Sequence, residues 1–352
     1  MRRILFAIPG DLGARTGGYE YDRRILQAVP ALGVDIVHLA MPGSFPEPSA
    51  QDVADAVESL DRAVKPGDVV LMDGLACGAL PESALRRIRM PLIELCHHPL
   101  CLEAGLAPAR AATLRENETR NLALVAHILA TSPHTAGTLV EDFSAPPAKI
   151  SVALPGTDPA ARAQGLGTPL TLLAVGSIIP RKGFDILVEA LAGLDDLDWR
   201  LNIVGSHAHA PATALALRER VASLGLAPRV EFAGERSSNA LSDLYGGADI
   251  FVSSSHYEGY GMALAEALAR GLPIVMTKGG AAGETVPDGT ALKVPPGDIP
   301  ALRSALRLAM TDRGLRLRLS DEAWRAGQQL PRWEDAARIV VEAARRVGAP
   351  AI

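Results

Sequence analysis

Hydrophobic residues form short uninterrupted runs that alternate, along almost the whole chain, with longer stretches of helical periodicity. Most of these runs contain four to six residues, often β-branched, and do not alternate with polar residues. This pattern is typical of parallel strands that helices cover on both faces. The predicted strands span residues 4–8, 34–39, 69–72, 92–95, 127–130 and 150–154, then 172–175, 201–204, 230–232, 250–252, 274–276 and 292–294.

Amphipathic stretches between these runs predict the helices of a doubly wound α/β fold, for example at residues 186–194, 212–224 and 302–310. The alternation pauses once, at residues 155–169, where Gly, Pro and Ala replace the periodic pattern. We therefore predict a linker between two Rossmann-like domains, residues 1–160 and 170–330, that face each other across a cleft. Residues 331–352 predict a closing helix that packs back toward the first domain.

The overall composition is that of a globular protein. Hydrophobic residues make up 48% of the 352 and charged residues 21%, and the length suits two domains. The net charge of −5 argues against nucleic acid as a partner. Only five of the 35 basic residues are lysines, so a lysine within a motif is informative.

Cysteine content and hydrophobic runs bear on location. The cysteines Cys77, Cys96 and Cys101 are few and odd in number, which predicts a reducing, cytoplasmic environment. No uncharged hydrophobic run approaches the roughly 18–20 residues of a membrane helix, and the apolar start of the chain stops at Pro9, too early for a signal peptide. The arginine-rich last helices leave peripheral contact with the inner face of an anionic membrane as an alternative.

A glycine-rich loop follows the first predicted strand and runs through Gly10, Gly13, Gly17 and Gly18 into a helical pattern from Tyr19. Glycines let the backbone approach a ligand closely, and the free N–H groups of a helix start favour an anion. The spacing differs from the Gly-x-Gly-x-x-Gly fingerprint of dinucleotide-binding folds, which argues against a dehydrogenase. The alternative to phosphate binding is a flexible turn.

A second loop, after predicted strand 250–252, carries two glutamates. Gly259 and Gly261 precede a clear helix, Glu258 lies in the loop, and Glu266 lies inside the helix. Backbone N–H groups at a helix start can hold a phosphate, whereas carboxylates are good acceptors for sugar hydroxyls. The alternative is a pair of ordinary surface glutamates, but their fixed separation around Gly-Tyr-Gly favours a site.

A cation follows the first strand of the second half. Arg181 and Lys182 lie in a glycine-containing loop at a strand end, where a positive charge is placed to neutralise a leaving phosphate. A solvated Arg-Lys turn is the alternative.

These stretches together resemble glycosyltransferase family 4, the retaining, nucleotide-sugar-dependent enzymes with the two-domain GT-B fold. The separation of Glu258 and Glu266 matches the family's two-glutamate signature, and residues 175–183 match its Gly-Arg…Lys-Gly segment. In the first half, Gly17-Gly18 matches the phosphate-proximal glycine pair, and residues 97–99 match its His-x-Pro. The resemblance covers nearly the whole chain and is strongest from residue 172 to about residue 296.

The resemblance implies a role for each matching residue of the second half, the donor side. Lys182, with Arg181, would balance the charge of the donor diphosphate. Backbone N–H groups of Gly259, Tyr260 and Gly261 would contact phosphate or sugar. Glu258 would hold a donor sugar hydroxyl, and Glu266 would bind the ribose hydroxyls.

In the first half, the acceptor side, Gly17 and Gly18 would approach the diphosphate and His97 would lie near the reacting sugar. Two positions depart from the family pattern. Ser177 stands where the family usually has arginine, which removes one expected diphosphate cation. Asp22 stands where many members have histidine, which bears on the acceptor side.

Two further patterns have the composition of metal sites. Residues 196–198 read Asp-Leu-Asp, but they form an acidic turn ahead of a strand. Cys96, His97, His98 and Cys101 have zinc-ligand side chains, yet successive residues leaving a strand point in different directions. We therefore predict no metal and no cofactor.

The sequence thus predicts a transferase that moves a hexose from a nucleotide diphosphate sugar to an acceptor, with retention of configuration. The acceptor, a glycan, a lipid-linked group or a small molecule, would meet loops such as residues 42–49 and 100–110. The alternatives are a non-catalytic sugar-nucleotide binding protein and a sugar-nucleotide epimerase of the same fold. A glycosidase would not require the phosphate loops.

Overall fold

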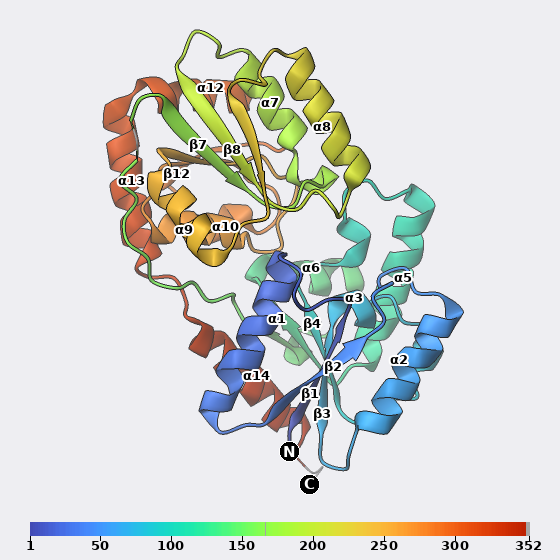
Figure 1. The fold of residues 1–352 in the computed structure, drawn as a ribbon. Coiled ribbons are helices and arrows are strands. Elements are labelled where there is room, and N and C mark those ends of the chain that lie inside the picture. The colour runs from blue at the N-terminus through green and yellow to red at the C-terminus, as the bar shows by residue number, and fades with distance from the viewer. Residues whose placement is uncertain (166, 350–352) are drawn as a thin grey trace. The chain divides into compact units, whose positions relative to one another are not determined.

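The computed structural model describes residues 1–165 and 167–349, which divide into two compact units. Unit 1 comprises Met1–Gly156 and Pro331–Ile352, and unit 2 comprises Thr157–Leu330 (Figure 1). Leu166 of the predicted linker and residues 350–352 of the closing segment lie outside the described residues. The described residues between 153 and 169 contain no helix or strand.

Unit 1 contains a six-stranded sheet in the order β2-β1-β3-β4-β5-β6, with every neighbouring pair parallel. The strand ends follow the partner strands. Ile36 pairs with Ile4, the first residue of β1, so the predicted strand 34–39 begins two residues later than expected. Val152 pairs with Ala130, the last residue of β5, so the predicted strand 150–154 ends early. The strands are β1 Ile4–Pro9, β2 Ile36–Met41, β3 Val69–Asp73, β4 Leu92–Cys96, β5 His127–Ala130 and β6 Ile150–Val152.

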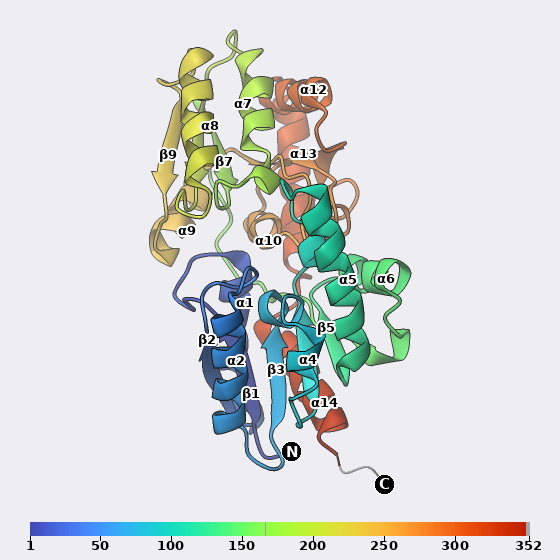
Figure 2. The same ribbon diagram turned by 90° about the vertical axis from the view of Figure 1, so that its right-hand side faces the viewer.

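Helices cover both faces of this sheet (Figures 1 and 2). One hydrophobic core joins the strands to the helices α2 to α6, with residues such as Leu60, Leu114 and Phe143 buried in it. On the other face, α1 packs against α14. The helical elements are α1 Gly17–Ala28, η1 Val29–Leu32, α2 Ala50–Ala63, α3 Gly74–Cys77, α4 Glu82–Leu85, η2 Leu100–Leu102, α5 Pro108–Leu124, α6 Pro133–Phe143, η3 Pro147–Lys149 and α14 Trp333–Val347.

Unit 2 contains a second parallel six-stranded sheet, in the order β12-β11-β10-β7-β8-β9. Each predicted strand of this half is present, extended by one or two residues at its ends. The two sheets confirm the predicted doubly wound parallel fold. The strands are β7 Leu170–Val175, β8 Trp199–Val204, β9 Val230–Gly234, β10 Ile250–Ser253, β11 Ile274–Thr277 and β12 Ala291–Val294.

Two hydrophobic cores enclose the sheet of unit 2. One includes buried residues of α7, α8 and α12, such as Leu187, Leu217 and Leu306. The other includes buried residues of α9, α10 and α13, such as Tyr245 and Leu268. The helical elements are η4 Pro180–Lys182, α7 Phe184–Ala192, α8 Pro211–Ser223, α9 Ser238–Gly247, α10 Met262–Ala269, α11 Ala282–Thr285, α12 Ile299–Thr311 and α13 Arg313–Gly327.

Each sheet has one point where the strand order reverses. In unit 1 it lies between β1 and β3, and in unit 2 between β7 and β10. At such a point the loops leaving the two strands turn to opposite faces and open a crevice at the carboxyl edge, where doubly wound proteins bind ligands. A ligand-binding site is therefore expected in the loops that follow these strands.

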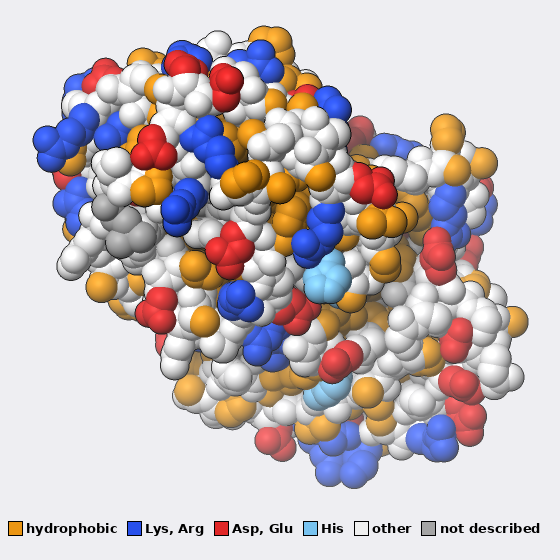
Figure 3. Space-filling view, turned by 45° about the horizontal axis from the view of Figure 1, so that its top comes forward, with side chains coloured by type: hydrophobic (Ala, Val, Ile, Leu, Met, Phe, Trp, Pro, Cys, Tyr) orange, Lys and Arg blue, Asp and Glu red, His pale blue; other side chains and the backbone are white. Residues whose placement is uncertain are grey.

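Charge and hydropathy of the described residues add two observations. No helix of residues 1–165 and 167–349 combines the length and apolar character that crossing a bilayer requires. On the face shown in Figure 3, acidic and basic side chains are interspersed among hydrophobic ones.

Candidate functional site

The loops after β7 and β10 meet at the strand reversal of unit 2. The first contains Gly176 and η4, and the second contains Glu258 and ends at α10. Backbone contacts join them, because the His256 N–H donates to the Arg181 carbonyl at 2.8 Å. The Ser254 hydroxyl likewise donates to the Lys182 carbonyl at 3.0 Å. The neighbouring strands thus bring together two segments that lie more than seventy residues apart.

Glu258 is the centre of an ion cluster. Lys182 Nζ lies 2.7 Å from Glu258 Oε1, and Arg181 Nη1 lies 3.3 Å from Oε2. The Ser255 hydroxyl donates to Oε1 at 2.6 Å. Arg181 also donates to the Tyr257 carbonyl at 2.8 Å, which fixes its guanidinium beside the carboxylate. The two predicted cations and the predicted sugar-binding glutamate are therefore direct neighbours.

The electrostatics of the cluster keep Glu258 ionised. Glu258 is only 7% exposed, and burial by itself would raise the pKa of its carboxyl group. The charges of Lys182 and Arg181, with hydrogen bonds from Lys182 and Ser255, outweigh burial and lower the pKa of Glu258 to about 2. One carboxylate faces two cations, so the cluster carries a net positive charge and can accept an anion.

Two glycines make this packing sterically feasible. Gly183 has a φ of +59°, and a Cβ there would lie 2.4 Å from the Ser254 carbonyl oxygen. A Cβ on Gly279 would lie 2.0 Å from the His256 carbonyl oxygen. Glu258 itself bridges to the strand-like segment at Gly280 and donates its N–H to the Gly279 carbonyl at 3.2 Å. Any side chain at these glycines would displace the loop that carries Glu258.

The predicted phosphate loop leads directly into α10. Gly261 is the N-cap residue, with a φ of +97°, and α10 begins at Met262. Tyr260 is 7% exposed, and burial raises its pKa to about 12, so its hydroxyl is neutral. Gly259, Tyr260 and Gly261 therefore precede the positive end of an eight-residue helix, as the sequence predicted.

Glu266 lies within α10 and contacts a buried tyrosine. The hydroxyl of Tyr245, on α9, lies within hydrogen-bond reach of two acceptors, the Glu266 side chain and the Ala263 carbonyl, which is 3.2 Å away. Burial, followed by the charge and hydrogen bond of Glu266, raises the pKa of Tyr245. Arg270 lies over the Tyr245 ring, with Cζ 4.6 Å from the ring centroid. Tyr245 thus contacts the Glu266 side chain and Arg270 its backbone carbonyl, and no local motif in the sequence predicts either contact.

In unit 1 the glycine pair lies inside the first turn of α1. The Thr16 side chain caps this helix, which begins at Gly17 and not at the predicted Tyr19. The ring of His97 lies beside Gly18, and a Cβ there would be in ordinary van der Waals contact with His97 Cδ2 at 3.5 Å. Gly17, Gly18 and His97 therefore belong to one site within unit 1.

Two buried aspartates complete this site. His97 Nε2 lies 3.4 Å from Asp22 Oδ1 and 3.3 Å from Asp73 Oδ2. Both aspartates are almost fully buried. Burial alone would lower the pKa of His97, but hydrogen bonds and charges from Asp22 and Asp73 raise it to about 10. Asp73 is the last residue of β3 and belongs to no local motif of the sequence.

In the described part of the chain, this trio is the one group of three or more His, Cys, Asp or Glu residues whose potential ligand atoms all lie within 4.8 Å of one another. Cys96 and Cys101, which the sequence analysis considered for zinc, are buried free thiols and do not belong to it. Asp196 instead forms a surface ion pair with Arg307 at 2.6 Å.

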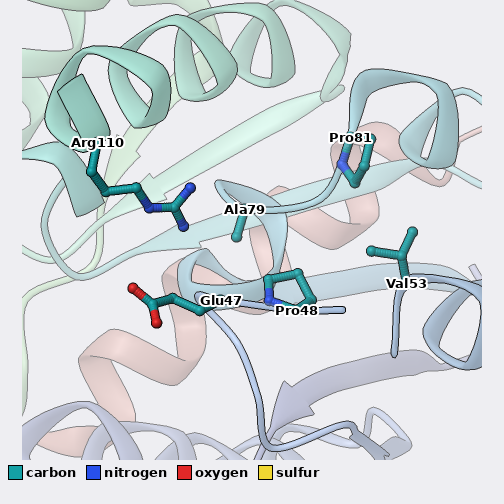
Figure 4. A pocket seen from close by; sticks show the side chains of 6 residues that line it. All are labelled: Glu47, Pro48, Val53, Ala79, Pro81 and Arg110. Atoms are coloured by element: carbon teal, nitrogen blue, oxygen red, sulfur yellow. The ribbon is translucent and has the colours of Figure 1, made fainter. Parts of the chain in front are cut away.

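Unit 1 also has a surface pocket of about 310 Å³, shown in Figure 4. Glu47, Pro48 and Arg110 line it, together with Val53, Ala79 and Pro81. Arg110 donates to the Pro46 carbonyl at 2.9 Å, which connects the two loops that were predicted to meet the acceptor.

Comparison with known proteins agrees with this geometry. Residues 159–325 match the family model "Glycosyl transferases group 1". The lipopolysaccharide core biosynthesis mannosyltransferase LpsB of Rhizobium meliloti is 35% identical over 165 residues, which are 45% of this chain and 44% of that protein. The MMP alpha-(1->4)-mannosyltransferase of Mycolicibacterium hassiacum is 28% identical over 311 residues, 83% of this chain and 74% of that protein. The mannosylfructose-phosphate synthase of Agrobacterium fabrum is 33% identical over 168 residues, and these cover 43% of this chain and 37% of that protein. The chain thus spans less than half the length of two of these three relatives.

Among solved structures, the sucrose-phosphate synthase of Thermosynechococcus elongatus has a TM-score of 0.82 at 20% identity, with 99% of this chain and all of that chain covered. The lipopolysaccharide glycosyltransferase WaaG has a TM-score of 0.73 at 20% identity, over 98% of this chain and 99% of that one. These similarities show the GT-B fold. With the match over residues 159–325, the family resemblance inferred from Glu258, Glu266, Lys182 and the glycine loops is confirmed, and the chain belongs to the glycosyl transferases group 1, glycosyltransferase family 4.

Proposed function

We propose that this protein is a retaining glycosyltransferase that moves a hexose from a nucleotide diphosphate sugar to an acceptor hydroxyl. The observation that carries this proposal is the cluster of Lys182, Arg181 and Glu258 at the strand reversal of unit 2. It combines positive charge for a diphosphate with a carboxylate for sugar hydroxyls. Related mannosyltransferases and glycosyltransferases support a hexose as the transferred group.

The donor diphosphate binds beside η4 and the start of α10. Lys182 and Arg181 neutralise its charge, and the backbone N–H groups of residues 259–261 hold its oxygens. Arg181 supplies the second cation that Ser177 does not, because its guanidinium lies in the same cluster as Lys182. Glu266, held by Tyr245, accepts the ribose hydroxyls.

Glu258 binds the donor sugar in its ionised form. Its carboxylate already accepts from Lys182, Arg181 and Ser255, and it offers a remaining lone pair to a sugar hydroxyl. Because the same carboxylate touches both cations, binding of the sugar and of the diphosphate are coupled. In unit 1, we propose Gly18 as a contact of the donor diphosphate and His97 as a contact of the reacting sugar.

The reaction is a front-face displacement through an oxocarbenium-like state. The bond between the sugar C1 and the phosphate oxygen breaks, and the acceptor oxygen bonds to C1 on the same face. The acceptor proton passes to the departing phosphate oxygen, whose charge Lys182 and Arg181 stabilise. The loops that line the pocket of Figure 4 are where we place acceptor recognition.

The test begins with thermal-shift screening of the full chain against UDP-, GDP- and ADP-sugars, since a ligand that binds only the folded protein raises its melting temperature. The donor that does so is then used in transfer and donor-hydrolysis assays. We expect Lys182→Ala to lower kcat/KM by about 100-fold or more. Lys293→Ala is the matched control, because Lys293 pairs with Asp288 at 2.7 Å outside the cluster.

Each competing function gives a different result in these assays. A non-catalytic binding protein would show donor stabilisation with no turnover on a broad acceptor panel. An epimerase would convert the donor alone. Equal turnover by wild type and a folded Lys182→Ala variant would contradict the role of the cluster.

A further inference from the structure

Asp22 is a buried carboxylate without ordinary partners. It lies on α1 and is 0% exposed, and within the described residues neither of its oxygens accepts a hydrogen bond of regular geometry; its ionic contact is the approach of His97 Nε2 to Oδ1 at 3.4 Å. Asp68 and Glu94, the other buried acids with an unpartnered oxygen in that part of the chain, each lack a partner at one oxygen only. Leaving a buried carboxylate unpaired is costly, so a nearby cation is needed to balance Asp22.

Within the described part of unit 1, the polar groups beside Asp22 are those of the cluster that it forms with His97 and Asp73. Asp73 is anchored independently, because its Oδ1 accepts from the Leu75 N–H at 2.7 Å while Oδ2 faces His97. The His97 ring is confined by the edge of Tyr21, at a centroid distance of 5.3 Å, and by Gly18. The backbone carbonyl of His97 accepts a hydrogen bond from the Thr131 hydroxyl at 3.1 Å.

The chemistry of imidazole then decides the form of His97. Nε2 faces two carboxylates, so its lone pair would be repelled and this nitrogen carries a proton. Burial, followed by the charge of Asp73, raises the pKa of Asp22 to about 7. Above that pH two buried negative charges lie 3.3–3.4 Å from Nε2 and favour the cationic ring, protonated on both nitrogens.

We propose that Asp22 is a positioning residue that, together with Asp73, holds His97 as an oriented imidazolium beside Gly18. This inference rests on the proposed function, because Asp22 reaches the reacting sugar only through His97. The imidazolium supplies a fixed positive charge and a hydrogen-bond donor to the sugar or to the phosphate oxygen as it departs. His97 does not act as a general base in this arrangement.

Four other titratable groups lie near the two aspartates and His97, and burial raises the pKa of three of them. Burial, with the charges of Asp73, Asp22 and Asp11, raises the pKa of Tyr19 to about 12, and burial raises the pKa of Tyr21 still further. Glu94 on β4 has its pKa raised to about 8, first by burial. The neighbouring His98 pairs with Glu103 at 3.1 Å. The two aspartates therefore control the titration of His97.

The first experiment is a nuclear magnetic resonance titration of the full chain with isotope-labelled histidine, in buffer containing EDTA. The His97 signal is assigned with a His97→Asn variant. In Asp22→Asn we expect the pKa of His97 to fall by about 1–3. Asp68→Asn is the matched control, since Asp68 is equally buried in unit 1 but pairs with Arg3 at 3.1 Å.

The second experiment measures kcat/KM against pH. In the wild type the alkaline limb set by His97 lies near pH 10, and Asp22→Asn moves that limb to lower pH by the same amount as the His97 midpoint. A merely structural role for Asp22 would lower activity equally at all pH values. An unchanged His97 midpoint, or a shifted midpoint with an unmoved alkaline limb, overturns the proposal.

Two further outcomes, metal binding at His97 and failure of the proposed function, can be distinguished from each other. If Mn²⁺ at micromolar concentration, added without EDTA, broadens the His97 signal, then Nε2 is a metal ligand and the imidazolium proposal is wrong. If the wild type neither binds nor turns over any sugar nucleotide, the proposed function is wrong, and so is the positioning role of Asp22 in that reaction. The titration still decides whether Asp22 holds His97 in its cationic form.

Discussion

Glu258 balances two cations with one carboxylate, and this predicts opposite effects on binding and turnover. In Glu258→Gln, Lys182 and Arg181 lose their buried counter-charge and attract the nucleoside diphosphate product at least as strongly as before. The sugar loses its charged acceptor, and we expect kcat to fall by about 100-fold or more. Calorimetry with the nucleoside diphosphate and steady-state kinetics measure the two effects separately.

The control for this substitution is Glu231→Gln, which removes an exposed carboxylate from β9 of the same unit. Since the pKa of Glu258 is lowered to about 2, its charge contributes stability above its ordinary pKa of 4.5 that is lost as the pH falls through about 2. Both variants should therefore be compared near pH 7 after a thermal melt confirms folding. Weaker product binding together with unchanged kcat would contradict the assigned role.

At the residue scale, the sequence could predict the groups whose signal lies in a local motif. Lys182, Glu258 and the two glycine loops stand in recognisable spacings, and Asp22 was visible as a departure from a family pattern. Asp73 was not predictable, because its contact with His97 arises where the neighbouring parallel strands β3 and β4 end side by side. Ser255 lies only three residues before Glu258, and the conformation of their loop brings its hydroxyl to the carboxylate. The pairing of Lys182 with Glu258 likewise depends on β7 and β10 being neighbours, which is a property of strand order.

At the scale of elements, uninterrupted hydrophobic runs predicted the strands because both faces of each sheet are covered. The ends of the strands were less predictable, since a partner strand determines where pairing stops. Short helices such as α3 and α4, each of four residues, are too short to show a periodic pattern.

β4 carries a charge-bearing residue inside a buried strand. Burial, followed by the charge of Glu118, raises the pKa of Glu94 from 4.5 to about 8. Its raised pKa means that folded protein binds a proton that the unfolded chain releases. The free energy of unfolding is therefore highest below about pH 4.5 and falls as the pH rises toward 8, by up to about 1.4 kcal/mol per pH unit.

We expect Glu94→Gln to remove this slope and to stabilise unit 1 at pH 8 relative to wild type. Urea unfolding at a series of pH values from 5 to 9 measures how the free energy of unfolding depends on pH. Glu116→Gln is the matched control, because Glu116 lies exposed on α5 and pairs with Arg120. A slope that persists in Glu94→Gln would show that another group governs the alkaline loss of stability.

At the scale of the whole molecule, the chain leaves unit 1 at Gly156 and returns to it at Pro331. The returning helix α14 is anchored by Trp333, which is 7% exposed and packs edge-on against Tyr21 at a centroid distance of 5.6 Å. Arg24 lies over the same ring, also at 5.6 Å. Since Tyr21 in turn contacts His97, the last helix supports the residues that hold His97.

Trp333→Ala should therefore destabilise unit 1 selectively. Truncating a buried tryptophan costs about 3–5 kcal/mol, and hydrogen exchange measured by mass spectrometry should show faster exchange in α1 and β1. Trp324→Ala is the reciprocal control, because Trp324 lies on α13 of unit 2 beside Gly271. It should increase exchange in unit 2 and leave α1 protected. If both substitutions loosened both units equally, the two units would unfold as one cooperative body, and the return of α14 would stabilise the molecule as a whole.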